Sequence, residues 1–302
     1  MIKIPPYLKK GSTIAITCPA GYMAAEKAQS CIHTLQQWGF QVMIGKTLGS
    51  TSQNYFSGTD EERLNELQAM LDSDAIDAII FGRGGYGITR IIDTINFTRF
   101  KKKPKWLIGY SDITALHTHI HSKYKIATLH APMAAAFNEG NNPFISSIRN
   151  AITGKKINYT CDGYTLNKKG IATGQLVGGN LALLAHVCGT ASDIDTKNKI
   201  LFIEDIGEYI YNIDRMLLQL KRSGKLQQLA GLIVGSFSGI KDTERPFGKT
   251  VNDSIAEMIQ EYNYPVCFNF PVGHATENVA LKSGITHQLS ITTKKVTLTE
   301  LR

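Results

Sequence analysis

Short apolar runs alternate with amphipathic stretches along the first half of the chain. Runs inside residues 11–21, 40–44 and 76–81 have the length and bulk of buried strands. Between them, residues 24–38 and 60–71 place apolar residues at helical spacing, and the second stretch carries charges on its opposite side. Strands that alternate with helices in this order predict a parallel sheet covered on both faces.

The most informative stretch of the chain runs from Lys105 to His117. It begins as an apolar strand and continues from Ser111 with helix formers, so the chain is expected to turn sharply at Gly109-Tyr110-Ser111-Asp112. Such a turn holds a serine hydroxyl clear of the sheet, and the N–H groups that open the following helix favour a developing oxyanion. The motif resembles the G-x-S-x-G nucleophile elbow, although Ile113 replaces its last glycine. Ser111 is interpreted either as a nucleophile or as a simple N-cap.

Between residues 150 and 170 the sequence changes from alternating strands and helices to clusters of polar turn residues, which predict a linker. The sequence is therefore divided into an N-terminal parallel-sheet α/β domain (1–152), a linker (153–170) and a C-terminal mixed α/β domain (171–302). The elements expected in the C-terminal domain are helices at 181–187, 212–221 and 251–261, strands at 199–204 and 231–236, and several short strands toward the end.

Composition limits the classes of protein that fit. The chain has 302 residues, of which 43% are hydrophobic and 19% charged, an ordinary globular balance. The formal net charge is +8, but the densest basic run, Lys101 to Lys105, is interpreted as a solvated loop before a strand rather than a nucleic-acid patch. The positive charge favours attraction of an acidic substrate.

Cysteine usage and the N-terminus indicate the compartment. Five scattered cysteines form no Cys-x-x-Cys pair, which argues against a disulfide framework or a zinc site and fits a reducing environment. The N-terminus lacks the apolar core of a signal peptide, and no stretch is long enough to span a membrane. A soluble, cytoplasmic protein is therefore expected.

A glycine-rich loop, Gly82-Arg83-Gly84-Gly85-Tyr86-Gly87, follows one strand and precedes a helix. It satisfies G-x-G-x-x-G, so a dinucleotide site is one interpretation. The loop follows the third strand rather than the first, however, and the next strand ends in Tyr110-Ser111, where a ribose-binding acid would be expected. We favour a second interpretation, in which the loop lies beside Ser111 and its backbone N–H groups form an oxyanion hole.

A serine nucleophile needs a base, and the base needs an acid that orients it. His274 lies in a glycine-bounded loop directly after the apolar strand 266–270, where a side chain can face a cleft. A second apolar run, 200–203, ends in Glu204, and Glu208 follows close by, so either glutamate is a candidate acid. The simpler interpretations are a hydrogen-bonded loop histidine and carboxylates that cap the next turn.

Two further groups of residues are considered. His117 and His121 share one face of the helix after the elbow and could bind a metal, but no carboxylate motif accompanies them, so no metal is predicted. Asn180, which ends a stretch of small residues, is a candidate helix cap or substrate contact.

Five motifs occur in an order and at spacings that resemble those of one enzyme family. They are Gly82-Arg83-Gly84-Gly85-Tyr86-Gly87, Gly109-Tyr110-Ser111-Asp112, Gly178-Gly179-Asn180, Phe202-Ile203-Glu204-Asp205-Ile206-Gly207-Glu208 and Gly273-His274-Ala275-Thr276-Glu277-Asn278. Together they resemble the LD-carboxypeptidases, also called muramoyltetrapeptide carboxypeptidases, over nearly the whole chain from Gly11 to about Gly284.

The resemblance implies a serine peptidase with a Ser-Glu-His triad. Ser111 would be the nucleophile, His274 the general base and Glu204 its orienting acid. The backbone N–H groups of Gly85 and Asp112 would form the oxyanion hole. The resemblance also implies a homodimer that uses no metal or cofactor.

The family's typical reaction removes the terminal D-alanine from cytosolic murein tetrapeptides during peptidoglycan recycling, so the expected partner is a murein peptide rather than nucleic acid or a membrane. Arg83 is the candidate cation for the terminal carboxylate of the peptide. A sister branch hydrolyses aminoacyl-nucleotide antibiotics of the microcin C type and is expected to stack the base on an aromatic side chain. Both tryptophans, Trp38 and Trp106, fall in expected helix and strand positions, which favours the murein branch. A nucleotide-dependent oxidoreductase and a non-catalytic binding protein are the remaining alternatives.

Overall fold

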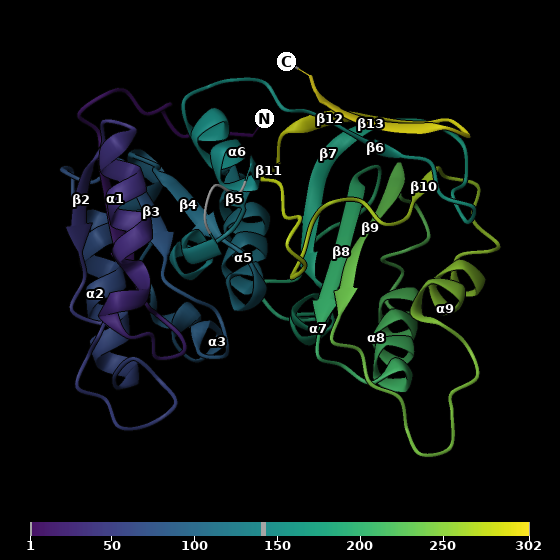
Figure 1. Ribbon diagram of the computed structural model, residues 1–302, viewed down its shortest axis with the longest axis horizontal. Helices are drawn as coiled ribbons and strands as arrows, with labels where there is room; N and C mark the ends of the chain where they lie inside the picture. The colour runs from purple at the N-terminus through teal and green to yellow at the C-terminus, as the bar shows by residue number, and fades with distance from the viewer. Residues whose placement is uncertain (1, 140–142, 302) are drawn as a thin grey trace. The chain divides into compact units, whose positions relative to one another are not determined.

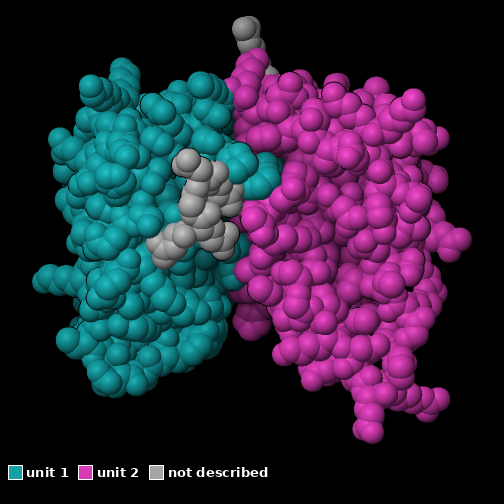
Figure 2. Space-filling model, in the orientation of Figure 1, with its two compact units in different colours: residues 1–155, 279–282 teal, residues 156–278, 283–302 magenta. Residues whose placement is uncertain are grey.

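The computed structural model describes residues 2–139 and 143–301, and the chain divides into two compact units (Figures 1 and 2). Unit 1 comprises residues 1–155 and 279–282, and unit 2 comprises residues 156–278 and 283–302. Each unit is built around its own sheet, so the predicted α/β class, with a parallel first sheet and a mixed second one, is confirmed. Whether the chain folds as separate domains at the boundaries predicted from the sequence stays a prediction.

The sheet of unit 1 has six strands in the order β11-β5-β4-β3-β1-β2 (Figure 1). Its strands are β1 (Thr13–Thr17), β2 (Gln41–Ile44), β3 (Ala78–Phe81), β4 (Trp106–Gly109), β5 (Thr128–His130) and β11 (Leu281–Ser283). The five strands from β2 to β5 pair in parallel. All residues of β3 and β4 are buried, as expected for strands in the middle of a sheet whose two faces are covered.

The helices of unit 1 follow the strands in turn. They are α1 (Gln29–Gln37), α2 (Asp60–Asp72), α3 (Ile88–Ile91), α4 (Thr98–Lys102), α5 (Thr114–Tyr124) and α6 (Pro143–Ile152). Because β2 and β3 lie on opposite sides of β1, right-handed crossovers place α1 and α2 on opposite faces of the sheet. The strand order reverses between β1 and β3, and in open α/β sheets ligands bind at the carboxyl ends of strands at such a point.

The sheet of unit 2 has seven strands in the order β10-β9-β8-β7-β12-β13-β6. Its strands are β6 (Asn158–Asp162), β7 (Gly170–Asn180), β8 (Ile200–Ile206), β9 (Gly231–Ser238), β10 (Val266–Cys267), β12 (Thr286–Ile291) and β13 (Lys295–Glu300). Strands β7 to β10 are parallel and the other three are antiparallel. Helices α7 (Leu181–His186), α8 (Ile210–Arg222) and α9 (Val251–Met258) share one hydrophobic core with the parallel strands. None of the helices within residues 2–139 and 143–301 has the length and apolar composition needed to cross a bilayer.

Several lysine ammonium groups are held against backbone carbonyls near the ends of helices, among them those of Lys105, Lys168 and Lys282. Lys105 Nζ donates to two carbonyls at the end of α2 (2.6 and 2.8 Å), and burial lowers the pKa of this amine to about 8. Lys168 Nζ donates to three carbonyls that follow α9, and Lys282 Nζ donates to a carbonyl just after α6. The expectation that Lys101 to Lys105 form a solvated loop is wrong in part. Lys101 to Lys103 are exposed, but the run begins inside α4 and ends in the buried side chain of Lys105.

Candidate active site

The turn after β4 carries Ser111 in a strained conformation. Tyr110 is extended, and Ser111 has a φ of 61° and opens a short 3₁₀ helix, Ser111–Ile113, that leads into α5. A residue with a side chain is uncommon in the left-handed region, and such strain is concentrated at functional sites. The sharp strand-to-helix turn predicted from the sequence is confirmed.

Ser111 does not act as an N-cap. The cap positions are Tyr110 for the 3₁₀ helix and Ile113 for α5, and neither makes a side-chain capping hydrogen bond. A capping serine has an extended backbone and accepts an N–H two or three residues ahead, which does not fit a φ of 61°. The alternative interpretation of Ser111 as a cap is therefore wrong, and its strained backbone needs another explanation.

The glycine loop after β3 lies directly against the elbow. A Cβ atom added to Gly84 would stand 2.9 Å from Ser111 Cβ and 3.0 Å from Ser111 Oγ, so any side chain there would collide with the serine. Gly85 has a φ of 95°, which favours glycine. Arg83 extends its guanidinium to the Tyr22 carbonyl (3.1 Å) and is exposed. The structure thus brings Arg83, Gly85, Ser111 and Asp112 together within unit 1, as the adjacency of the two strands predicted.

The Asp112 side chain has a role that the sequence did not indicate. It is 1% exposed, and its Oδ2 accepts the backbone N–H of Ile88 (2.9 Å), the first residue of α3. Burial raises the pKa of the Asp112 carboxyl to about 6, against the opposing effect of the N–H groups of Ile88 and Gly87 and the positive charge of Arg63. The residue after the serine thus caps a helix that begins beyond the glycine loop rather than its own helix.

Arg63 holds the same loop from another side. Its side chain is fully buried, and Nη1 donates to the carbonyls of Pro19 (2.6 Å) and Gly87 (3.2 Å) while Nη2 pairs with Asp60. This links the loops that follow β1 and β3, which meet where the strand order reverses. The sequence did not indicate that Arg63 links these loops, because an arginine on an amphipathic helix is normally expected to be exposed.

In unit 2, a buried carboxylate binds the candidate base. Glu204, in β8, is 0% exposed, and its Oε2 lies 2.6 Å from His274 Nδ1. A carboxylate only accepts hydrogen bonds, so Nδ1 carries the proton that is donated to Glu204. In the neutral ring, Nε2 is then the basic nitrogen, as a general base facing a serine requires.

Small residues let the His274 loop approach the parallel strands. Gly273 has a φ of 127°, and a Cβ there would stand 2.3 Å from Ser236 Oγ and 2.9 Å from Glu204 Cβ. Ser236 Oγ also accepts the N–H of Ala275 (3.3 Å), which fastens the other side of His274. Ser236 was not singled out from the sequence, because a serine inside an apolar strand carries no local signal.

The other predicted residues of unit 2 are Asn180, which ends β7, and Glu208, which follows β8. Asn180 is buried and caps α7, with Oδ1 accepting the Leu183 N–H and Nδ2 donating to Asp205 (2.8 Å). Burial raises the pKa of the Asp205 carboxyl to about 6. Glu208 accepts a hydrogen bond from Asn212 Nδ2. Of the two candidate acids, Glu204 is therefore the one bonded to His274, and a substrate contact for Asn180 stays a prediction.

The histidines of α5 are part of the core. His117 is 1% exposed, its Nε2 hydrogen bonds with the Gly109 carbonyl (2.8 Å), and burial lowers the pKa of the ring to about 4. His121 is also buried. Within residues 2–139 and 143–301, no three His, Cys, Asp or Glu side chains are grouped closely enough to hold a metal ion.

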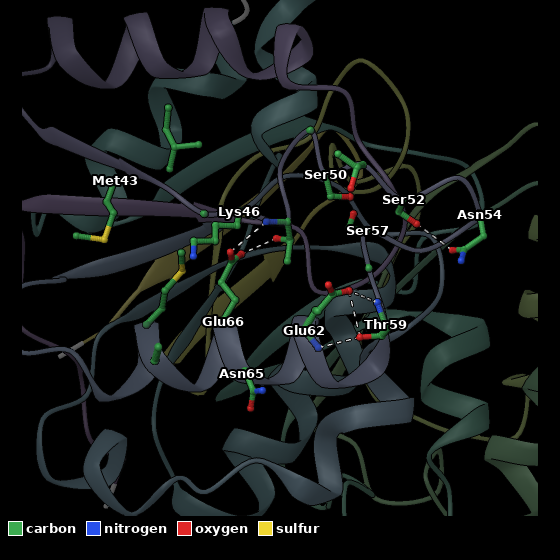
Figure 3. A pocket seen from close by; sticks show the side chains of 18 of the residues that line it. Met43, Lys46, Ser50, Ser52, Asn54, Ser57, Thr59, Glu62, Asn65 and Glu66 are labelled. Carbon is green, nitrogen blue, oxygen red and sulfur yellow. Dashed lines mark hydrogen bonds between the residues drawn. The ribbon is translucent and has the colours of Figure 1, made fainter.

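A pocket of about 1180 Å³ opens in unit 1 between β2, α2 and the loop that joins them (Figure 3). Its lining includes Glu66, whose carboxylate accepts hydrogen bonds from Thr17 Oγ1 (2.6 Å) and the Thr47 N–H (3.0 Å). Small polar side chains such as Ser52 and Asn65 line much of the rest. None of the predicted site residues lines this pocket, so the candidate catalytic groups of unit 1 lie outside it.

Comparison with known proteins gives one consistent answer. The LD-carboxypeptidase N-terminal domain matches residues 14–131, and the LD-carboxypeptidase C-terminal domain matches residues 173–289. A probable murein peptide carboxypeptidase of Bacillus subtilis is 36% identical over 93% of this chain and 89% of its own length. The microcin C7 self-immunity protein MccF of Escherichia coli is 26% identical over 97% and 94%.

A solved structure supports the same relationship. The crystal structure of a muramoyltetrapeptide carboxypeptidase from Oxalobacter formigenes has a TM-score of 0.86 and 29% sequence identity, covering 96% of this chain and 99% of that one. Both the N-terminal and the C-terminal domain of the family match this chain, and the solved structure covers nearly all of it. The chain therefore belongs to the LD-carboxypeptidase family of peptidases.

Proposed function

We propose that this protein is a serine LD-carboxypeptidase that releases the terminal D-alanine from murein tetrapeptides. The observation that carries the proposal is the hydrogen bond between buried Glu204 and His274 Nδ1, because a triad base needs this contact to hold its tautomer. The strained Ser111 at the end of β4 supplies the matching nucleophile. The murein substrate is inferred from the names of the relatives in Bacillus subtilis and Oxalobacter formigenes.

The proposed reaction follows the usual order for a serine peptidase. His274 Nε2 takes the proton of Ser111 Oγ as this oxygen attacks the carbonyl carbon of the last peptide bond. The N–H groups of Gly85 and Asp112 stabilise the tetrahedral oxyanion, and His274 then returns the proton to the leaving D-alanine amine. Water hydrolyses the acyl-enzyme by the same route in reverse, and Glu204 orients the imidazole throughout.

Substrate recognition needs a cation, because the peptide ends in a free carboxylate. Arg83 is the proposed partner, since its exposed guanidinium lies in the glycine loop beside Ser111. The proposal also places the enzyme in the cytoplasm as a homodimer that takes part in peptidoglycan recycling.

The protein is expected to cleave a murein tetrapeptide with a C-terminal D-alanine and to leave an analogue that ends in L-alanine intact. The measurement is mass spectrometry of purified peptide before and after incubation, with the Ser111→Ala variant as the blank. In the same assay an aminoacyl adenylate analogue should react more slowly, because Trp106 is fully buried and Trp38 ends α1, so neither offers a loop surface for a base.

Cleavage of the adenylate analogue at an equal or greater rate would instead assign the protein to the microcin immunity branch. That branch is the second candidate because MccF of Escherichia coli covers nearly the whole chain. Binding of tetrapeptide without any product would reject the murein tetrapeptide as the substrate, and no turnover of either compound would contradict both hydrolase assignments.

Turnover is expected to be unchanged by EDTA, because the proposed nucleophile, base and acid are all side chains of this chain. The measurement is kcat/KM after dialysis against the chelator and again after addition of Zn²⁺. A loss of activity that zinc restores would contradict this mechanism and return attention to the histidines of α5.

A further inference from the structure

We propose that the carboxylate of Asp112 is a positioning residue that locks the glycine loop against the Ser111 elbow and so sets the geometry of the oxyanion hole. The inference rests on the proposed serine mechanism. It concerns the side chain of Asp112, whereas the proposed catalytic contact of this residue is made by its backbone N–H.

The carboxylate joins two loops that follow neighbouring strands. Asp112 comes directly after Ser111 on the turn beyond β4, and its Oδ2 accepts the N–H of Ile88 (2.9 Å), directly after the glycine loop beyond β3. The N-cap of α3 is Gly87, which has no side chain with which to satisfy the first N–H groups of the helix. Asp112 supplies that cap from the adjacent loop.

The glycine loop depends on such external bonds. Gly85 and Gly87 have φ values of 95° and 155°, and glycine has the greatest conformational freedom of any residue. Besides Asp112, the loop is held by Arg63, which donates to the Gly87 carbonyl, and by Gly21, whose N–H donates to the Gly84 carbonyl (3.1 Å). Release of the Asp112 bond would therefore loosen the segment between Gly85 and Ile88, which the Arg63 bond to the Gly87 carbonyl would still hold in part.

A small movement of this loop would directly affect the proposed chemistry. Gly84 lies so close to the Ser111 side chain that a Cβ atom on it would collide, so the loop and the nucleophile have little room to move independently. One of the two proposed oxyanion donors, Gly85, belongs to the loop, and the other, Asp112, belongs to the elbow. A misplacement of about 1 Å in a reacting group costs on the order of 100-fold in rate.

The lock depends on pH because the ionised carboxylate is the stronger acceptor. Arg63 on α2 is the charged group that faces Asp112, and burial raises the pKa of the carboxyl to about 6. Above this pH Asp112 is ionised and holds the Ile88 N–H. As the pH falls through about 6 the carboxyl is protonated and the lock weakens.

The experiment measures the rate at which an alkyl fluorophosphonate labels Ser111. In this step the Ser111 Oγ–P bond forms, the P–F bond breaks, fluoride leaves, and the serine proton passes to His274. The oxyanion hole stabilises the phosphoryl oxygen, so the rate reports the hole without requiring that the peptide substrate be known. Mass spectrometry locates the adduct, and Ser111→Ala is the blank.

Asp112→Ala is expected to lower the labelling rate about 10- to 100-fold, and Asp112→Asn to recover part of that loss because its amide oxygen can still accept one N–H. Glu300→Gln is the matched control. Glu300 is also a buried carboxylate that accepts a backbone N–H, that of Ile157 (2.9 Å), but it lies in unit 2 outside the proposed machinery. The Glu300→Gln variant should be labelled at the same rate as the unmodified protein.

The dependence of the labelling rate on pH distinguishes a positioning role of the carboxylate from a contribution to folding alone, which would not change this dependence. In the unmodified protein, protonation of Asp112 should lower the labelling rate as the pH falls through about 6. The Asp112→Asn variant has no carboxyl to protonate, so this component of the pH profile should be absent. Circular dichroism and thermal melting confirm that the variants are folded.

The inference is overturned if folded Asp112→Ala and Asp112→Asn label at the unmodified rate, or if the pH profile of Asp112→Asn is the same as that of the unmodified protein. An unmodified protein that is not labelled overturns both the nucleophile assignment and this inference. Failure to cleave a murein tetrapeptide would reject the substrate alone, because labelling does not use the peptide.

Discussion

Replacement of Ser111 by alanine is expected to reduce turnover by about 10³-fold or more while the fold stays intact. The substitution removes only the Oγ atom, so the elbow keeps its Cβ beside Gly84. The oxyanion donors and substrate contacts would remain, and a small residual rate over the uncatalysed reaction is expected from them. The measurement is kcat on murein tetrapeptide, with circular dichroism to verify folding.

Ser254→Ala is a suitable control for this experiment. Ser254 is a buried serine on α9 whose hydroxyl makes no hydrogen bond to the described residues, so its removal deletes the same atom in a location without proposed chemistry. It should retain full activity. If Ser111→Ala keeps more than about a tenth of the activity, the serine is not the nucleophile.

The second large effect separates the two glutamates near the end of β8. Glu204→Gln is expected to lower kcat by about 10³- to 10⁴-fold with little change in substrate binding, because an amide in place of the carboxylate favours the wrong tautomer of His274. The direct bond of 2.6 Å between Glu204 Oε2 and His274 Nδ1 is the reason for this expectation. A rigid strand end also fixes the imidazole better than a turn does.

Glu208→Gln is the matched control and should change kcat by only a few-fold. Glu208 bonds to Asn212 at the start of α8, and a glutamine oxygen can accept the same hydrogen bond. Measurement of kcat for both variants, each checked for folding, decides between them. A dead Glu208→Gln enzyme beside an active Glu204→Gln enzyme would exchange the two roles.

The sequence predicted most of the longer elements, because their signals are local. The fully buried run that forms β3 and the charged, amphipathic helix α2 could be recognised without knowledge of any partner. Short strands could not. β6 lies where polar turn clusters predict a linker, and its partner β13 comes more than a hundred residues later, so only the tertiary fold shows the pairing.

The residues of the candidate site also fall into two groups, those that a local sequence signal marks and those that only the tertiary fold reveals. Ser111 and His274 could be singled out because a strand end or a bounding glycine marks each position in the chain. The Asp112 side chain could not be assigned, because its bond to Ile88 depends on β3 and β4 being neighbours in the sheet. Arg63 was missed for a related reason. The sequence of α2 does not distinguish a buried arginine from an exposed one, and only the structure shows that Arg63 is buried.

A charge that faces the protein's own carbonyl groups is a poor partner for anything in solution. Lys105, Lys168 and Lys282 each direct an ammonium group toward carbonyl oxygens near a helix end, where the helix dipole is negative. The formal net charge of +8 counts these three lysines like exposed ones. It therefore overstates the positive electrostatic potential at the protein surface that a polyanion in solution would experience. The protein should therefore bind a cation exchanger more weakly than its composition suggests, and acylating reagents should reach the buried amines of Lys105 and Lys282 last.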